Sequence, residues 1–194
     1  MQKIVIRAAV VATASLLLAG CSSSLATSPG TANSNGEQRI VSVDGPEFGS
    51  VEQLAAEADL VVKGHFGARS EAVTEGALNG GDWEGLPMEL WGFVVDEVVA
   101  GDETLAGTTI QVSQVTTDVD GAIRPASDGA SAVLFLKPYP SGAYAIVGLG
   151  AGTIFVDESG DLSVPDDVPA TLEKDVEKLT SATVERTIEN SFAK

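Results

Sequence analysis

The side chains that most often carry chemistry are scarce in this chain, which has one histidine and one cysteine in 194 residues. Any histidine-dependent catalytic triad would have to use His65, which lies in a β-branched run. A serine nucleophile usually stands in a Gly-x-Ser-x-Gly turn, but the nearest match, Gly129-Ala130-Ser131-Ala132-Val133, lacks the second glycine. We therefore expect no catalytic residue, and a structural or surface role for His65.

Metal sites are equally hard to build from these residues. Zinc needs three or four histidine, cysteine or acidic ligands together. Asp118-Val119-Asp120-Gly121 begins like a calcium loop, but the later ligands and the closing glutamate of an EF-hand are missing at the required spacing. The acidic residues Asp157, Glu158 and Asp161 are typical of a solvated turn. We expect no metal and no cofactor, with loose divalent-cation binding at these turns as the alternative.

The N-terminus has the three zones of an export signal. Lys3 and Arg7 give a basic start, an apolar stretch runs from Ala8 to Ala19, and small residues precede Cys21. The apolar stretch is shorter than the roughly 20 residues that a helix needs to cross a bilayer. Residues 1–20 are therefore interpreted as a signal peptide and not as a transmembrane helix.

The end of this signal, Leu18-Ala19-Gly20-Cys21, resembles the lipobox of bacterial lipoproteins. The resemblance implies that the Cys21 thiol receives a diacylglyceryl group and that cleavage before Cys21 makes it the first residue. The membrane would then be a partner through a lipid anchor on the outer face of the cytoplasmic membrane, or at the outer membrane of a Gram-negative host. The alternative is an ordinary signal peptide followed by a chance cysteine.

Acylation of Cys21 would leave the mature domain without a thiol, which excludes disulfides and thiolate sites from it. Loss of residues 1–20 would remove two of the 11 basic residues and none of the 28 acidic ones, giving 9 − 28 = −19. Nucleic-acid binding needs clustered lysine and arginine, so we expect no such partner. A negative surface is better suited to a cationic ligand.

The chain divides into a tether and one domain. Residues 21–39 are mainly small and polar, which is typical of a flexible tether, and residues 40–194 suit a single acidic, β-rich domain. Ser50-Val51-Glu52-Gln53 has capping-box spacing and predicts a short helix. β-Branched runs separated by turn residues predict strands at about Leu60–Ala68, Glu89–Val99, Thr108–Val115, Ala132–Lys137, Ala143–Val147, Thr153–Val156 and Asp161–Val164.

Both alternating faces of the strand from Met88 to Val99 are largely apolar, so we expect cover on both sides. The expected cover is a helix from about Pro169 to Asn190. Its apolar stripe at helical spacing consists of Leu172, Val176, Leu179, Thr183, Val184 and Ile188. The predicted fold is mainly β (α+β): a small antiparallel, OB-like barrel with a short N-terminal helix and a longer C-terminal helix packed on it.

Three further segments carry a second resemblance. Ala58-Asp59-Leu60-Val61-Val62-Lys63-Gly64, then Phe93-Val94-Val95-Asp96-Glu97-Val98-Val99-Ala100-Gly101, then Val133-Leu134-Phe135-Leu136 follow the order found in small secreted bacterial β-barrel domains. In this the chain resembles netrin-like and other OB-type domains. The resemblance implies a fold and does not imply an activity.

The longest predicted loop runs from Ser70 to Pro87 and contains Trp83 between Asp82 and Glu84, with a glycine on each side of this triplet. Long loops on small barrels often carry function. The indole is either an exposed binding anchor or a cover that folds back onto the barrel mouth, and we expect the second. Trp83, Asp82 and Glu84 are the candidate binding residues.

These features predict a membrane-anchored, extracytoplasmic lipoprotein with a non-enzymatic binding domain, whose partner is an envelope protein or a cationic ligand. The alternatives are a hydrolase of envelope polymers that uses two carboxylates and an accessory solute-binding lipoprotein. A hydrolase requires a pocket with converging carboxylates, whereas a binding module requires an exposed aromatic or apolar patch.

Replacing Cys21 by serine tests the lipoprotein assignment. Because the thiol is the acylation nucleophile, Cys21→Ser should abolish both lipidation and cleavage before residue 21. Detergent partitioning and intact mass of the exported protein measure the two effects. An unmodified N-terminus in the parent protein would refute the assignment.

Overall fold

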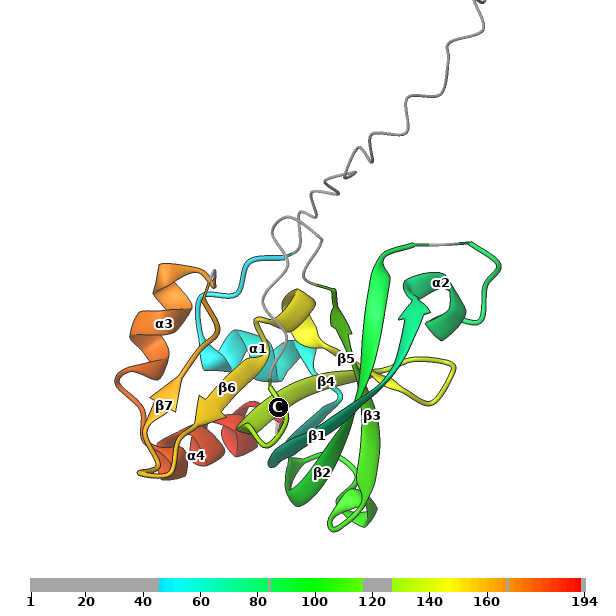
Figure 1. Cartoon of the computed structure of the whole chain (residues 1–194). Helices are drawn as coiled ribbons and strands as arrows, with labels where there is room; N and C mark the ends of the chain where they lie inside the picture. The colour runs from blue at the N-terminus through cyan, green and yellow to red at the C-terminus, as the bar shows by residue number, and fades with distance from the viewer. Residues whose placement is uncertain (1–45, 84, 117–126, 167, 193–194) are drawn as a thin grey trace, which may run out of the picture. The chain divides into compact units, whose positions relative to one another are not determined.

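The computed structural model describes residues 46–83, 85–116, 127–166 and 168–192 (Figure 1). The predicted signal and tether, residues 1–39, and the segment Asp118–Gly121 lie outside these residues. The elements in chain order are α1 Val51–Glu57, β1 Leu60–Thr74, α2 Glu75–Leu78, β2 Pro87–Ala100, the 3-10 helix η1 Glu103–Leu105, β3 Thr109–Val115, β4 Ser131–Pro138, β5 Tyr144–Ile146, the 3-10 segment η2 Val147–Gly150, β6 Thr153–Val156, β7 Leu162–Ser163, α3 Ala170–Val176 and α4 Ser181–Phe192. None of the described helices is long and apolar enough to span a membrane.

Five strands close into a barrel in the order β1-β2-β3-β5-β4, and pairing of β4 with β1 completes the ring. This confirms the predicted small, OB-like barrel of a mainly β, α+β domain. One detail departs from the expected antiparallel barrel, because β3 and β5 run parallel, with Val112 opposite Tyr144 and Ser113 opposite Ala145. Outside the ring, β6 pairs with β4, and β7 pairs with β6.

Strand β4 is buried on both faces. Ala132, Leu134 and Leu136 point into the barrel, where they join its interior cluster. The alternate residues Val133 and Phe135 belong to a second cluster on the outer side, together with residues of the helices. Since successive side chains of a strand point to opposite faces, one apolar run supplies both the barrel core and the surface on which the helices pack.

The helices α1, α3 and α4 share this outer cluster through Leu54, Leu172, Val184 and Ile188, and Figure 1 shows them grouped on one side of the barrel. As the capping-box spacing predicted, the amide of Gln53 donates to the Ser50 hydroxyl at the start of α1 (3.3 Å). The amide of Val51, the first residue of α1, donates to the Asp175 carboxylate of α3 (3.0 Å). The first turn of α1 is thereby tied to the C-terminal segment.

The C-terminal cover differs from the prediction in two respects. It consists of two helices because α3 ends at Val176, and the amide of Thr180 donates to the Thr183 hydroxyl (2.6 Å), which starts a new helix. Leu179 lies between them and is only partly buried. The helices also cover β1 and β4, whereas only the end of β2, at Val99 and Ala100, packs against their cluster.

The predicted loop from Ser70 to Pro87 is largely ordered structure. Strand β1 continues through it as far as Thr74, which pairs with Pro87 of β2. The Thr74 hydroxyl then accepts a hydrogen bond from the amide of Ala77 (3.3 Å) and caps the short helix α2. Among the described residues, the irregular part is therefore confined to 79–83, 85 and 86.

Truncation of Ile188 tests whether the helices belong to the folded domain. Ile188 is fully buried in the outer cluster, so Ile188→Ala should lower the free energy of unfolding by about 2–5 kcal/mol. The exposed neighbour Glu189 provides the control, and Glu189→Ala should change it by less than about 0.5 kcal/mol. Equal midpoints of urea unfolding for the two variants would show that α4 contributes nothing to stability.

Candidate functional site

Trp83 is the one large apolar side chain that stands exposed among the described residues, with 51% of its surface accessible. The expectation that its indole folds back to cover the barrel mouth is therefore wrong. The physical reason is local: glycines surround the ring, so it rests on its own loop. Its predicted neighbour Asp82 is exposed as well, and Glu84 lies outside the described residues.

Three glycines form the seat of this indole. A Cβ atom at Gly81 would lie 2.7 Å from ring atoms Cδ1 and Nε1, and one at Gly85 would lie 2.3 Å from Cζ3. At Gly76 of α2 a Cβ would meet the carbonyl oxygen of Trp83 at 1.6 Å. The ring and its backbone therefore occupy space that is open only because these three residues lack side chains.

Hydrogen bonds hold the loop around this seat. The amide of Gly81 donates to the carbonyl of Gly76 (2.9 Å), and the amide of Glu75 donates to the carbonyl of Leu86 (2.9 Å). Beneath the loop, Leu78 is buried with Met88, Val115 and Ala143. Its carbonyl also accepts from the amide of Ser141 in the β4–β5 turn (3.2 Å). The indole is thus exposed on a support that is fixed to the barrel.

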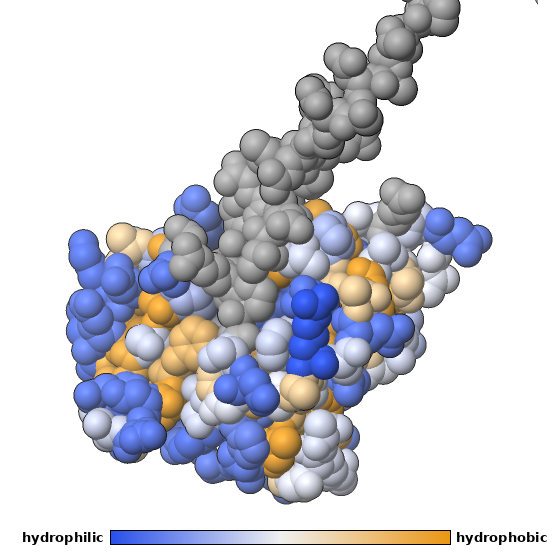
Figure 2. All heavy atoms as spheres, viewed as in Figure 1, coloured by the Kyte–Doolittle hydropathy of each residue, from blue (hydrophilic) through white to orange (hydrophobic). Residues whose placement is uncertain are grey.

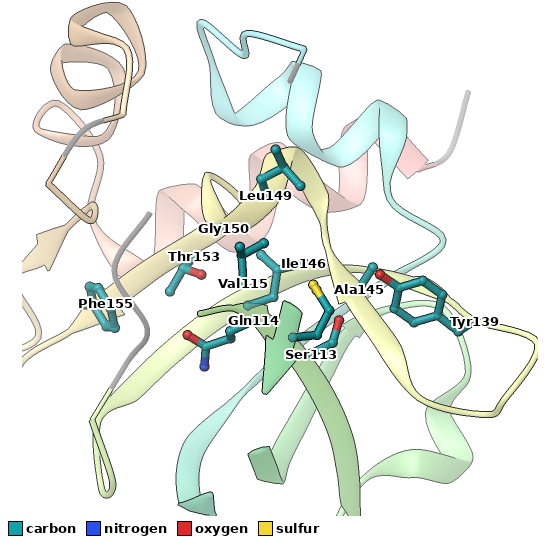
Figure 3. A pocket seen from close by; sticks show the side chains of 11 residues that line it. Ser113, Gln114, Val115, Tyr139, Ala145, Ile146, Leu149, Gly150, Thr153 and Phe155 are labelled. Atoms are coloured by element: carbon teal, nitrogen blue, oxygen red, sulfur yellow. The ribbon is translucent and has the colours of Figure 1, made fainter. Parts of the chain in front are cut away.

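A second feature is a cavity at the end of β3, shown in Figure 3. It holds about 470 Å³ of empty space, including its open mouth, and lies between β3, β5, η2 and β6. In Figure 3 Tyr139 and Phe155 stand on opposite sides of it and Leu149 stands above it. The lining contains no charged side chain.

The polar groups of this cavity are neutral. Ser113 is 2% exposed and Thr153 is 4% exposed. The Ser113 hydroxyl is buried beside the phenol of Tyr139. Burial raises the pKa of Tyr139, and the nearby Ser113 hydroxyl lowers it by less. Tyr139 therefore remains a neutral phenol at physiological pH, so the cavity offers hydroxyl groups, the side-chain amide of Gln114 and no charge.

Backbone strain is present at the same cavity. Leu149 has φ 56° and ψ 29°, between Gly148 and Gly150, which also have positive φ. A left-handed conformation costs a residue with a Cβ about 1–2 kcal/mol. Strain of this kind persists only where the surrounding structure fixes it, and it often accompanies binding sites.

The other residues singled out from the sequence lie apart from both features. Nδ1 of His65 contacts the Asp96 carboxylate at 3.3 Å on the exposed surface of β1 and β2. Asp157 accepts hydrogen bonds from the amides of Ser159 and Asp161 (both 2.8 Å), as in the predicted hairpin turn between β6 and β7. Within the described residues, no three histidine, cysteine or acidic side chains gather as a metal site would require.

Sequence reasoning found the Trp83 loop but missed the cavity. The only sign of the cavity in the sequence was the polar pair Ser113-Gln114, which follows Ile110 and Val112 in an otherwise largely apolar strand. A polar pair at the end of a strand usually reads as the start of a turn. Here both residues are buried, because β5 and β6 close over them from distant parts of the chain.

The glycine seat can be tested with a matched pair of substitutions. Gly85 and Gly80 both have positive φ (64° and 72°), but only at Gly85 would a Cβ meet the indole. Gly85→Ala should therefore shift the Trp83 indole N–H resonance strongly, whereas Gly80→Ala should add similar backbone strain and leave that resonance nearly in place. The spectrum is simple to read because the chain has two tryptophans. Equal shifts in both variants would show that the ring does not rest on Gly85.

No family model matches this sequence, and no curated protein matches it.

Proposed function

We propose that this protein is an extracytoplasmic lipoprotein, anchored at Cys21, whose domain binds a cationic segment of an envelope protein through Trp83. The observation that carries the proposal is the exposed indole on its glycine seat. Tryptophan is among the residues that most often dominate binding energy at protein interfaces. A ring that is already fixed loses little conformational entropy when a partner covers it.

The preference for a cationic partner follows from charge and ring chemistry. The chain carries 28 acidic against 11 basic residues, and Figure 2 shows hydrophilic residues around much of the viewed face. The exposed carboxylate of Asp82 is next to the indole in the chain. Tryptophan is the best aromatic partner for a cation, which is worth about 0.5–2 kcal/mol. A lysine or arginine over the ring would thus meet both a π-face and a negative field.

The position of the loop supports the same function. In OB-type barrels the loop between the first two strands and the loop between the last two commonly bind ligands. Here the first of these loops carries Trp83, and Ser141 of the second donates its amide to Leu78 at the base of the first. This support is an analogy at the level of the fold, whereas the glycine seat is specific to this chain.

The predicted tether would give the domain reach. If the segment from Ser22 to Arg39 is a random coil, its mean span would be roughly 20–25 Å. The Debye length at physiological salt is about 8 Å. A domain held at that distance would be largely screened from the charge of the membrane surface and would be free to meet partners in the envelope.

Titration of the full chain with a lysine-rich peptide of about eight residues tests the proposal. Trp83→Ala leaves the charge unchanged, so a roughly tenfold loss of affinity, with less than about 1 kcal/mol change in stability, would assign the loss to the ring. Trp83→Leu separates the two contributions of the indole. It keeps an apolar side chain but removes the π-face, and should bind the peptide little better than Trp83→Ala.

A charge-matched control completes the experiment. Asp82→Asn and Asp59→Asn each remove one exposed carboxylate, but Asp59 lies at the opposite end of β1 from the loop. The first should weaken the peptide more than the second, and added salt should reduce the difference. Binding that depends only on total charge, with Trp83→Ala equal to the parent, would overturn the proposal.

A further inference from the structure

The pair Asn79-Gly80 ends α2 and begins the loop that carries Trp83. Asn79 follows the last residue of the helix, with φ −81° and ψ 0°, and Gly80 has φ 72°. Both residues are exposed, and a Cβ atom at Gly80 would meet nothing within 4 Å. The side-chain amide of Asn79 and the backbone amide of Gly80 are therefore neighbours in the chain at an open place on the surface.

An asparagine that precedes a glycine is well suited to modify itself. Asparagine is a thermolabile residue, and glycine has no Cβ to hinder attack by its amide nitrogen. The Gly80 nitrogen loses its proton and forms a bond to Cγ of Asn79, the Cγ–Nδ2 bond breaks, and Nδ2 leaves as ammonia with that proton. Water then opens the resulting succinimide at either carbonyl, which gives aspartate or isoaspartate. Water is the only co-reactant, and the position gains a negative charge.

Two hydrogen bonds occupy the reacting groups in the folded turn. Nδ2 of Asn79 donates to the carbonyl of Glu75 (3.0 Å), and the amide of Gly80 donates to the carbonyl of Ala77 (3.1 Å). Ring closure must break both bonds, so it passes through an opened end of α2. This helix has only four residues, and so short a helix has little stability of its own. Local openings cost less free energy than global unfolding, so the reaction is accessible to the folded domain.

The same turn supports Trp83. The amide bond of Gly80 and that of Gly81 to the carbonyl of Gly76 (2.9 Å), with Gly80 in the left-handed conformation, form a Schellman motif. Gly76 and Gly81 are two of the three glycines in the seat of the indole. Aspartate at position 79 would replace the Nδ2 donor by a carboxylate that repels the carbonyl oxygen it faces. Isoaspartate would also add one carbon atom to the backbone, which the geometry of the motif does not accommodate.

We propose that Asn79 is a self-modifying site, which is converted in the folded protein through a succinimide with Gly80 into aspartate or isoaspartate, and that conversion loosens the seat of Trp83. The modification does not depend on the function proposed for Trp83, because its chemistry needs only this turn and water. The indole is then held firmly in newly made protein and loosely in aged protein.

Peptide mapping of the aged full chain by mass spectrometry tests the reaction. During incubation at mildly alkaline pH, the peptide that contains Asn79 should gain one mass unit and separate into two products. The same dipeptide at Asn35-Gly36, in the predicted tether, provides an internal reference. We expect conversion at Asn79 to be about tenfold slower than at Asn35, which corresponds to about 1.4 kcal/mol for opening the turn. Asn79 that stays an amide after Asn35 has converted fully would overturn the proposal.

Hydrogen exchange tests the consequence for the turn. Asn79→Asp supplies one product directly and should raise the exchange rates of the amides of Gly80 and Gly81 about fivefold, the effect of one net hydrogen bond. Asn190→Asp adds the same charge at an exposed residue of α4 and should leave both rates unchanged. Equal rates in Asn79→Asp and the parent would overturn the proposed loosening. Neither measurement uses the lysine-rich peptide, so this proposal and the function proposed for Trp83 fail separately.

Discussion

The pairing of β1 with β4 is the contact on which the rest of the domain depends. It closes the barrel, and it places side by side two strands whose alternate residues face opposite ways. Leu60, Val62 and Leu134 fill the interior, while Val61 and Phe135 face the helices. Without this pairing there would be neither a closed interior nor an outer apolar surface, and α1, α3 and α4 would have nothing to cover.

The Trp83 loop and the cavity share one cluster of buried apolar side chains. The cluster of Leu78, Met88, Val115 and Ala143 lies beneath the Trp83 loop. Met88 and Val115 also line the cavity. An apolar contact of this kind transmits small displacements because protein interiors are close-packed. The indole and the cavity are therefore built on one set of side chains, although they offer different chemistry.

The sequence was most informative where local pattern and tertiary structure agree. Alternating apolar residues and turn residues located the seven strands, and Ser50 located the start of α1. The pattern failed at two places, for different reasons. Trp83 was expected to pack back onto the barrel mouth, yet Gly76, Gly81 and Gly85 leave space for its ring on its own loop. Ser113 was not recognised because its burial depends on β5 and β6, which follow it by many residues.

The position of β4 in the chain also sets the order in which this domain can fold. Leu60 pairs with Leu136, so the ring cannot close until most of the polypeptide is available, and contacts of such sequence separation make folding slow. Before that moment the first strands have only each other, and a hairpin alone is marginally stable in water. The nascent chain consequently remains unfolded for longer than a helical bundle of equal length would.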